Sequence, residues 1–196
     1  MSEKLFKRLE IAGAFVVFLL ATLLHFLYYL YPSVLTSLFA AVNESIWEHI
    51  KIFTIAYLFY AFIELLWAKP LLKRFVVSKT MGALVQGGFI PIAYYSYTFF
   101  VKKPALVVDL LIGFLASVLG FLVSYGIYKS EKNFEKYFLT SVMFLFLILM
   151  MLLCFTYYPP EVELFRDVIT GGFGVTPKNI DMGAFAIDAL KNIDIF

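Results

Sequence analysis

Residues 137–158, YFLTSVMFLFLILMMLLCFTYY, form an uncharged run that is long enough to cross a membrane as a helix. The hydrocarbon core of a bilayer requires about 20 consecutive apolar residues in a helical span. The run is apolar on every side, whereas a helix on the surface of a soluble protein keeps one polar face. Pro159 and Pro160 follow it, and proline cannot continue the hydrogen bonding of a helix. We therefore predict a membrane-spanning helix that ends at these prolines.

Further apolar runs of comparable length precede this one. We predict spans at Leu9–Tyr31, Ile46–Trp67, Met81–Val101 and Ala105–Tyr128, followed by the span at Tyr137–Tyr158. Gly87, Gly88 and Pro91 predict a break within the third span, because glycine and proline disfavour a helix. Residues 33–42 are apolar but too short to span, which is typical of a half-helix or an interfacial helix. The predicted fold class is all-α, an integral membrane bundle of about five transmembrane helices.

The composition of the chain indicates a lipid-embedded protein. Of its 196 residues, 62% are hydrophobic and 15% are charged, whereas a soluble domain is about half apolar and about a quarter charged. The net charge is only +2, and the basic residues lie at the ends of the apolar runs, which argues against a nucleic-acid partner. The single cysteine, Cys154, excludes an intrachain disulfide and a cysteine-based metal site. The expected partners are the lipid bilayer and, for so small a bundle, a second copy or a subunit of a membrane complex.

The distribution of basic residues predicts the orientation of the chain in the membrane. Ten of the 16 lysines and arginines precede the first span or lie in the links between spans two and three and between spans four and five. Cytoplasmic segments carry the excess of basic residues in membrane proteins. We therefore expect a plasma-membrane protein with a cytoplasmic N-terminus and an extracytoplasmic C-terminus. Residues 1–160 would form the spanning domain, and residues 161–196 a tail packed on its outer end.

A polar block, VNESIWEHIK at residues 42–51, lies at the start of the second span. It brings two carboxylates, an imidazole, an amide and an ammonium to the edge of the bilayer, where charged groups are costly unless they are solvated, paired or bound. One interpretation is structural. Ser45 and Glu48 match a capping box at the start of the span, and Glu48 and Lys51 have the spacing of an ion pair. Trp47 then serves as an interfacial anchor.

A second interpretation of the block is a metal site. On a helix Glu44 would lie one turn from Glu48, and two carboxylates so close share a proton, a cation or a base. The two histidines of the chain, His25 and His49, both fall at the depth of the block. Imidazole and carboxylate suit zinc, iron or manganese, although the spacing matches no established signature. The candidate ligands of a divalent metal are therefore His25, Glu44, Glu48 and His49. A histidine in a span can also serve as a hydrogen-bonding packing residue.

Asp109 is a further carboxylate inside a predicted span, close to its outer end. Such a group usually faces the interior of the bundle and has a partner, either in a functional site or in an ion pair with a lysine such as Lys51, Lys102 or Lys103. The candidate binding cluster comprises Asn43, Glu44, Glu48, His49, Lys51 and Asp109. Most unusual polar groups thus converge on one end of the bundle. Glu64 is the exception, and we interpret it as an interfacial residue that snorkels to the membrane surface.

The polar block resembles the signature of a family of small multi-pass bacterial membrane proteins of unknown function, with the pattern VNES-x-WEH-x-K. Other features similar to that family are His25, the tyrosines Tyr94, Tyr95 and Tyr97 that lead to Asp109, and Tyr158-Pro159-Pro160 followed by residues 164–167. The resemblance extends to about residue 175. It implies a bacterial plasma-membrane protein, and it supplies no activity, substrate or catalytic residue.

Two function classes stay open, because the chain contains no Gly-x-Ser-x-Gly elbow, P-loop or dinucleotide-binding fingerprint. The first is a metal-dependent enzyme embedded in the membrane that acts on a lipid or a lipid-linked substrate, with the polar cluster as its site. The second is a non-enzymatic carrier of a small solute or ion, or an accessory subunit of a membrane complex. Charged residues along several spans would favour a carrier. In the predicted cytoplasmic half, little beyond Glu64 is charged within a span.

Overall fold

The structure is a computed structural model that describes residues 3–102 and 104–175. In this part of the chain the α-helices are α1 (Glu3–Leu30), α2 (Val34–Phe39), α3 (Ile46–Ala68), α4 (Leu72–Val101), α5 (Leu106–Lys129) and α6 (Phe138–Tyr157). Two 3₁₀ turns, η1 (Glu135–Tyr137) and η2 (Glu163–Phe165), flank α6. The β-type pairing among the described residues is an isolated bridge between Arg166 and Phe173. The predicted all-α class is confirmed.

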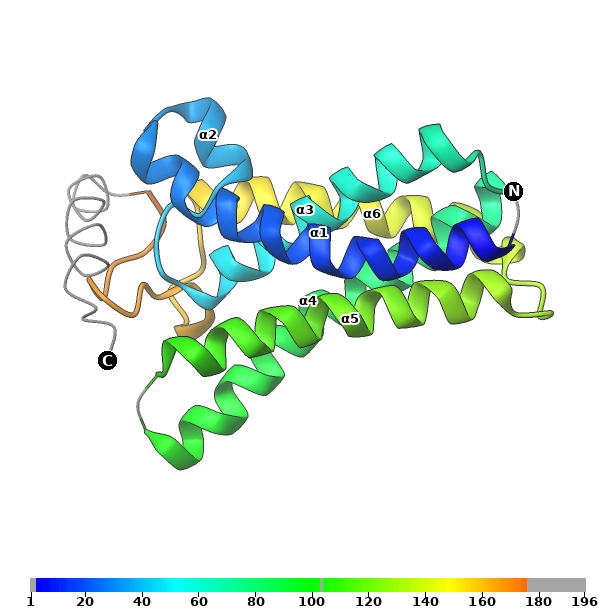
Figure 1. Ribbon diagram of the computed structural model, residues 1–196. Coiled ribbons are helices and arrows are strands. Elements are labelled where there is room, and N and C mark those ends of the chain that lie inside the picture. The colour runs from blue at the N-terminus through cyan, green and yellow to red at the C-terminus, as the bar shows by residue number, and fades with distance from the viewer. Residues whose placement is uncertain (1–2, 103, 176–196) are drawn as a thin grey trace.

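Five helices are long and apolar enough to cross a membrane, namely α1, α3, α4, α5 and α6. Figure 1 shows them as an elongated bundle, with the short α2 near one end. The most apolar stretch of α6 is 11% buried within the protein, whereas that of α4 is 50% buried. A helix that leaves so much apolar surface uncovered is suited to contact with lipid. The predicted bundle with five membrane-length helices is therefore correct.

Helix α4 differs from its predicted span in two respects. It begins at Leu72 rather than Met81, and it continues without interruption through Gly87, Gly88 and Pro91. The added turns pack inside the bundle, since α4 contacts α3, α5 and α6 and its early residues are largely buried. Proline is tolerated in a membrane helix where neighbouring helices compensate for the lost hydrogen bond. Packing between helices thus outweighs the local preference for a break.

Two glycines allow α4 and α5 to approach each other closely. A Cβ atom on Gly82 would lie 2.6 Å from the carbonyl oxygen of Gly120, and one on Gly120 would lie 3.0 Å from that of Gly82. A side chain at either position would therefore push the helices apart. Ala116 and Ser124 lie one turn on either side of Gly120 and are also fully buried. Small residues thus form the face of α5 that meets α4.

The chain from residue 158 to residue 175 folds over the end of the bundle at which α3 begins (Figure 1). The Phe165 ring is buried there, with its centroid 4.8 Å from that of Trp47 and 5.3 Å from that of Phe155. The side-chain amide of Asn43 donates a hydrogen bond to the carbonyl oxygen of Gly174 at 3.2 Å. The first part of the predicted tail is thus packed on the bundle. Its remainder, residues 176–196, lies outside the described residues.

Candidate functional site

The polar block folds as a turn followed by the start of α3. Ser45 caps the helix, because its side chain accepts a hydrogen bond from the backbone amide of Glu48 at 3.3 Å. The side chain of Asn43 accepts from the backbone amide of Ser45 at 2.9 Å, which fixes the turn before the helix. Glu44 therefore lies in the turn rather than on α3. The predicted stacking of Glu44 and Glu48 on one helical face is wrong for this reason.

The Glu48 carboxylate is held in a buried ion pair, which we call the Glu48–Lys51 pair. Lys51 Nζ lies 2.5 Å from Glu48 Oε2, and both side chains are almost completely buried. The backbone amide of Val42 donates to Glu48 Oε2 at 3.0 Å, and the Thr156 hydroxyl approaches Oε1 at 3.4 Å. Lys51 also donates to the Ser37 carbonyl oxygen and to the Thr156 hydroxyl, both at 2.9 Å. The pair joins α2, α3 and α6, and Glu48 is not placed with the histidines as a fourth ligand.

His25 of α1, Glu44 of the turn and His49 of α3 come together at this end of the bundle, and we call them the His/Glu cluster. His25 Nε2 lies 3.4 Å from Glu44 Oε1, and His49 Nε2 lies 3.9 Å from Glu44 Oε2. One ligand atom from each of the three residues lies within 4.8 Å of the others. The Tyr29 hydroxyl donates to Glu44 Oε1 at 2.9 Å. His49 Nδ1 lies 2.8 Å from the Ser45 carbonyl oxygen, and a proton on Nδ1 leaves Nε2 as the acceptor.

The His/Glu cluster borders a cavity of about 210 Å³ between α1, α3, α4 and α5. Much of its wall is apolar, including Phe18, Phe53, Ile90, Leu110 and Val168. The last of these residues belongs to the chain segment that follows α6 and covers this end of the bundle. The cavity therefore combines a concentrated group of metal-ligating side chains with an apolar interior, a combination typical of small-molecule sites.

Asp109 of α5 lines the same cavity. The Tyr97 hydroxyl donates to Asp109 Oδ1 at 2.5 Å and accepts a hydrogen bond from the backbone amide of Ala105 at 3.2 Å. A tyrosine is therefore the partner that the structure provides for this carboxylate. Among the lysines considered from the sequence, Lys51 is paired elsewhere and Lys103 lies outside the described residues.

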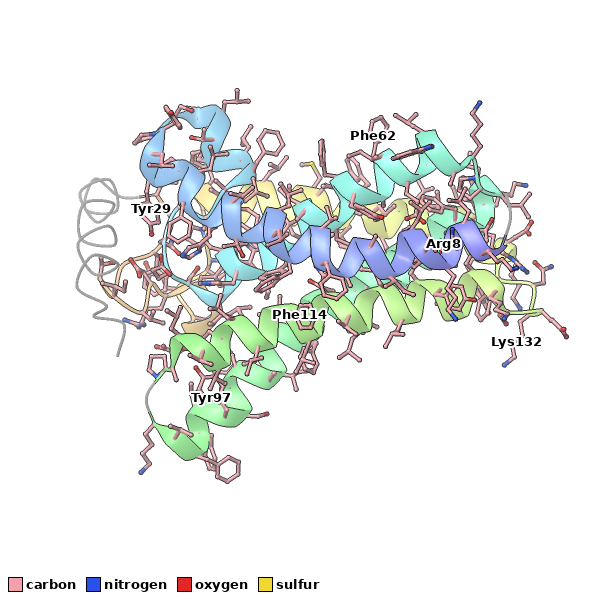
Figure 2. The ribbon with its side chains drawn as sticks, in the orientation of Figure 1. Arg8, Tyr29, Phe62, Tyr97, Phe114 and Lys132 are labelled. Atoms are coloured by element: carbon pink, nitrogen blue, oxygen red, sulfur yellow. The ribbon has the colours of Figure 1, made fainter. Side chains whose placement is uncertain are left out.

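The structure divides the sequence-predicted site residues into two groups. The first group meets at the cavity and consists of His25, Glu44, His49 and Asp109. The second group holds the turn and the buried ion pair and consists of Asn43, Glu48 and Lys51. Figure 2 shows Tyr29 of α1 and Tyr97 of α4, the hydrogen-bond partners of Glu44 and Asp109, toward the same end of the bundle.

A second group of charged side chains, which the sequence analysis did not identify, lies in the other half of the bundle. Lys79 Nζ of α4 lies 3.0 Å from Glu10 Oε1 of α1 and 2.6 Å from Glu64 Oε2 of α3. We call these residues the buried triad, because each is at most 3% exposed. The interpretation of Glu64 as an interfacial residue is therefore wrong. The sequence did contain a signal for this group, because Glu10 and Glu64 are charged residues within apolar runs. Lys79 is a third such residue, since α4 begins at Leu72 and includes it.

Comparison with known proteins identifies the family of this chain but assigns it no activity. A family model described as a family of unknown function, DUF6512, matches residues 2–175. No curated protein and no solved structure matches the chain. The matched range contains the five long helices, the His/Glu cluster and the buried triad. Because the match covers most of the chain, the protein belongs to DUF6512, a family of unknown function.

Proposed function

We propose that this protein is a metal-dependent enzyme embedded in the membrane, and that its substrate is a lipid or a lipid-linked molecule. One observation carries the proposal. The ligand atoms of His25, Glu44 and His49 converge within 4.8 Å of one another at the wall of a largely apolar cavity of about 210 Å³. Two imidazoles and one carboxylate suit a divalent transition-metal ion, and zinc is one ion that takes this donor set.

The geometry of the His/Glu cluster supports this assignment. Zinc binds histidine nitrogen and carboxylate oxygen at about 2.0–2.2 Å, so that two ligand atoms of a tetrahedral ion lie roughly 3.3 Å apart. His25 Nε2 lies 3.4 Å from Glu44 Oε1, and His49 Nε2 lies 3.9 Å from Glu44 Oε2. Small side-chain movements would reduce these distances. The ligands are also oriented by neighbours, since the Ser45 carbonyl oxygen contacts His49 and the Tyr29 hydroxyl contacts Glu44.

The number of ligands favours a catalytic role over a structural one. Structural zinc sites use four protein ligands, whereas catalytic sites use three and keep one position open for water or substrate. An ion held by the cluster would supply an activated water molecule or polarise a carbonyl or phosphoryl group. Asp109 lines the same cavity, and its hydrogen bond from Tyr97 orients its carboxylate. Asp109 is therefore the residue that we expect to accept a proton or to bind the polar part of the substrate.

The lining of the cavity supports the substrate class. Apolar side chains such as Phe18, Phe53 and Leu110 would contact an alkyl chain, while the cluster and Asp109 would contact a polar head. The cavity walls are formed by helices that are long and apolar enough to span a membrane. A molecule with both an apolar chain and a polar head is thus the ligand that this site would recognise.

Elemental analysis of the purified protein tests the proposal. After dialysis against metal-depleted buffer and reloading with zinc, we expect one zinc ion per wild-type chain. The variants His25→Ala and Glu44→Gln should each lose it, because each removes one of three ligands. Asp109→Asn is the matched control, since this residue lines the cavity without belonging to the cluster, and it should retain the ion. Zinc content that is negligible in the wild type, or unchanged in His25→Ala and Glu44→Gln, would contradict the proposal.

A carrier remains the second candidate, and the buried triad favours it. The triad places charged side chains of α1, α3 and α4 in the half of the bundle opposite to the His/Glu cluster. Ionisable residues inside membrane helices often mark a path for ions or protons. Reconstitution into liposomes that contain a pH-sensitive dye separates the two candidates. A carrier coupled to protons would change the internal pH when a transported solute is added, whereas an enzyme would not.

We also propose a plasma-membrane location with the N-terminus in the cytoplasm. The support is the excess of basic residues in the first turns of α1, near the turn between α3 and α4, and between α5 and α6. A topology reporter inserted after Glu131 should then behave as cytoplasmic, and one fused at Phe196 as extracytoplasmic. The opposite pattern would reverse the orientation and place the His/Glu cluster on the cytoplasmic side.

A further inference from the structure

The buried triad connects four membrane-length helices through hydrogen bonds and ion pairs. Lys79 of α4 contacts the carboxylates of Glu10 on α1 and Glu64 on α3 at 3.0 and 2.6 Å. Ser124 of α5 donates a hydrogen bond to Glu10 Oε1 at 2.9 Å. The triad shares no residue with the His/Glu cluster. An inference from the triad therefore does not depend on the proposed metal site.

The triad is buried among aromatic side chains. The Lys79 ammonium lies 4.7–5.8 Å from the ring centroids of Phe6, Tyr57, Phe75 and Phe121. Such rings attract the ammonium through their negative faces, but they add no counter-charge for the carboxylates. Each triad residue is at most 3% exposed, which removes the solvation that a charge has in water.

The charges of the triad do not balance when both carboxylates are ionised. Two carboxylates and one ammonium sum to a net charge of −1. Among the described residues, Glu10 Oε2 and Glu64 Oε1 are buried and have no hydrogen-bond partner. An uncompensated buried charge of this kind is strongly unfavourable. One further positive charge is therefore required at the bare carboxylate oxygens.

We infer that the buried triad is a proton-binding site, in which Glu10 and Glu64 hold one proton between them at neutral pH. A proton brings the triad to zero net charge and occupies a single carboxylate oxygen, which Glu10 Oε2 or Glu64 Oε1 can supply. A sodium ion would require several oxygen ligands around it, and aromatic rings surround much of this site.

The other titratable groups near the triad do not replace this proton. Tyr57 of α3 lies against the Lys79 ammonium, and Tyr60 of α3 donates its hydroxyl hydrogen to the Leu9 carbonyl oxygen at 2.7 Å. Both phenols are neutral at neutral pH in water, and neither can contribute positive charge. Lys79 is the cation that the structure places within ion-pair distance of Glu10 and Glu64 in the described part of the chain.

Infrared spectroscopy of the purified full-length protein tests the inference, because a protonated carboxyl group absorbs separately from a carboxylate. At neutral pH the wild type should show the absorption of one buried protonated carboxyl group. Glu10→Gln and Glu64→Gln should each abolish it, because each leaves one carboxylate for one ammonium. Glu163→Gln is the control, since it makes the same change at an exposed carboxylate, and it should leave the absorption unchanged.

Three infrared results would overturn the inference. The first is a wild-type spectrum without the absorption, and the second is an absorption that persists in both Glu10→Gln and Glu64→Gln. The third is an absorption that appears only after sodium is removed, which would identify a sodium site. The zinc content of Glu10→Gln should equal that of the wild type whatever the spectra show. A failure of the triad inference is therefore distinguishable from a failure of the metal proposal.

Thermal unfolding provides a second measurement that does not depend on spectral assignment. Each single variant keeps one carboxylate for Lys79, so its melting temperature should stay close to that of the wild type. The double variant Glu10→Gln/Glu64→Gln leaves the ammonium without a counter-charge and should melt at a clearly lower temperature than either single variant. A double variant as stable as the single variants would contradict the assignment of both carboxylates to one site.

Discussion

The Glu48–Lys51 pair and the buried triad are both charged groups inside the bundle, yet they differ in charge balance. In the pair, one carboxylate faces one ammonium, and Val42 and Thr156 provide hydrogen bonds to the carboxylate. In the triad, two carboxylates share one ammonium, and two of their oxygens have neither a hydrogen bond nor an ion pair among the described residues. The pair also lies within one helix turn, whereas the triad is assembled from three helices.

This difference separates a structural use of buried charge from a functional one. A balanced and fully hydrogen-bonded pair can hold segments in register without any ligand. The Glu48–Lys51 pair does this for α2, α3 and α6. An unbalanced group needs an additional ligand, and for the triad the smallest ligand that restores balance is a proton. The charge balance and the unpaired carboxylate oxygens of a buried group thus distinguish a structural role from a ligand-binding role, whereas burial alone does not.

The largest effect is expected at the Glu48–Lys51 pair. Glu48→Gln leaves the Lys51 ammonium buried without its counter-charge, so we expect the free energy of unfolding to fall by roughly 3–5 kcal/mol. Chemical denaturation in detergent micelles measures this loss. Glu163→Gln, at an exposed position, is the control and should change the free energy by less than about 0.5 kcal/mol. If the Glu48→Gln protein were as stable as the wild type, the balanced Glu48–Lys51 pair would have no greater structural role than the triad.

The next effect concerns the His/Glu cluster, which lies at the same end of the bundle as the pair. A histidine must be neutral to bind a metal, so protons compete with zinc for the imidazole nitrogens. Zinc affinity should therefore fall as the pH decreases from about 7.5 to about 5.5. Competition with a chelator at both pH values measures the change. An affinity independent of pH would argue against histidine ligands.

A smaller loss of stability is expected when the cluster loses one imidazole. His25→Ala takes an imidazole at ion-pair distance away from the half-buried Glu44, so the free energy of unfolding should fall by roughly 1–3 kcal/mol and bound zinc should be lost. Thr22→Ala is a suitable control, because Thr22 lines the same cavity and its hydroxyl donates to the Phe18 carbonyl oxygen of its own helix. Unfolding and zinc content are both measured on the purified variants. Unchanged values in His25→Ala would mean that His25 has no role in a site.

The smallest effect is expected in the triad, where one carboxylate is in excess. Glu10→Gln should change the free energy of unfolding by less than about 1 kcal/mol, because Glu64 still pairs with Lys79. The same denaturation experiment compares it with Glu48→Gln, which makes an identical substitution in the balanced pair. A loss at Glu10 as large as the loss at Glu48 would show that both carboxylates of the triad are needed for folding.

Much of the fold could be predicted from the sequence because membrane spans are a local property. Run length and uniform hydrophobicity located five helices, and for most of them the bounds differ by only a few residues. The start of α4 was missed, since residues 72–80 contain Lys73, Arg74 and Lys79 and have the local composition of a loop. Most of these residues are buried against neighbouring helices, and a sequence read locally does not contain that information.

The candidate site shows the same limit at the level of side chains. His25, Glu44 and His49 could be grouped from their scarcity and their common depth in the membrane. Glu48 was added to them on the assumption of a continuous helix, whereas the turn fixed by Asn43 removes Glu44 from that helix. The triad could not be assembled by spacing, because its members belong to three different helices and meet only through tertiary packing.

Helix α1 contributes one member to each chemical group, since Glu10 belongs to the triad and His25 to the His/Glu cluster. These residues lie about four turns apart on a single helix, roughly 22 Å along its axis. The hydrogen bond between Asn43 and Gly174 joins points 131 residues apart, so the chain from α3 to α6 forms a closed ring that does not include α1. An axial shift of α1 against this ring would alter the His25–Glu44 and Glu10–Lys79 distances together. Helix α1 is thus a single rigid element that spans both groups of charged side chains.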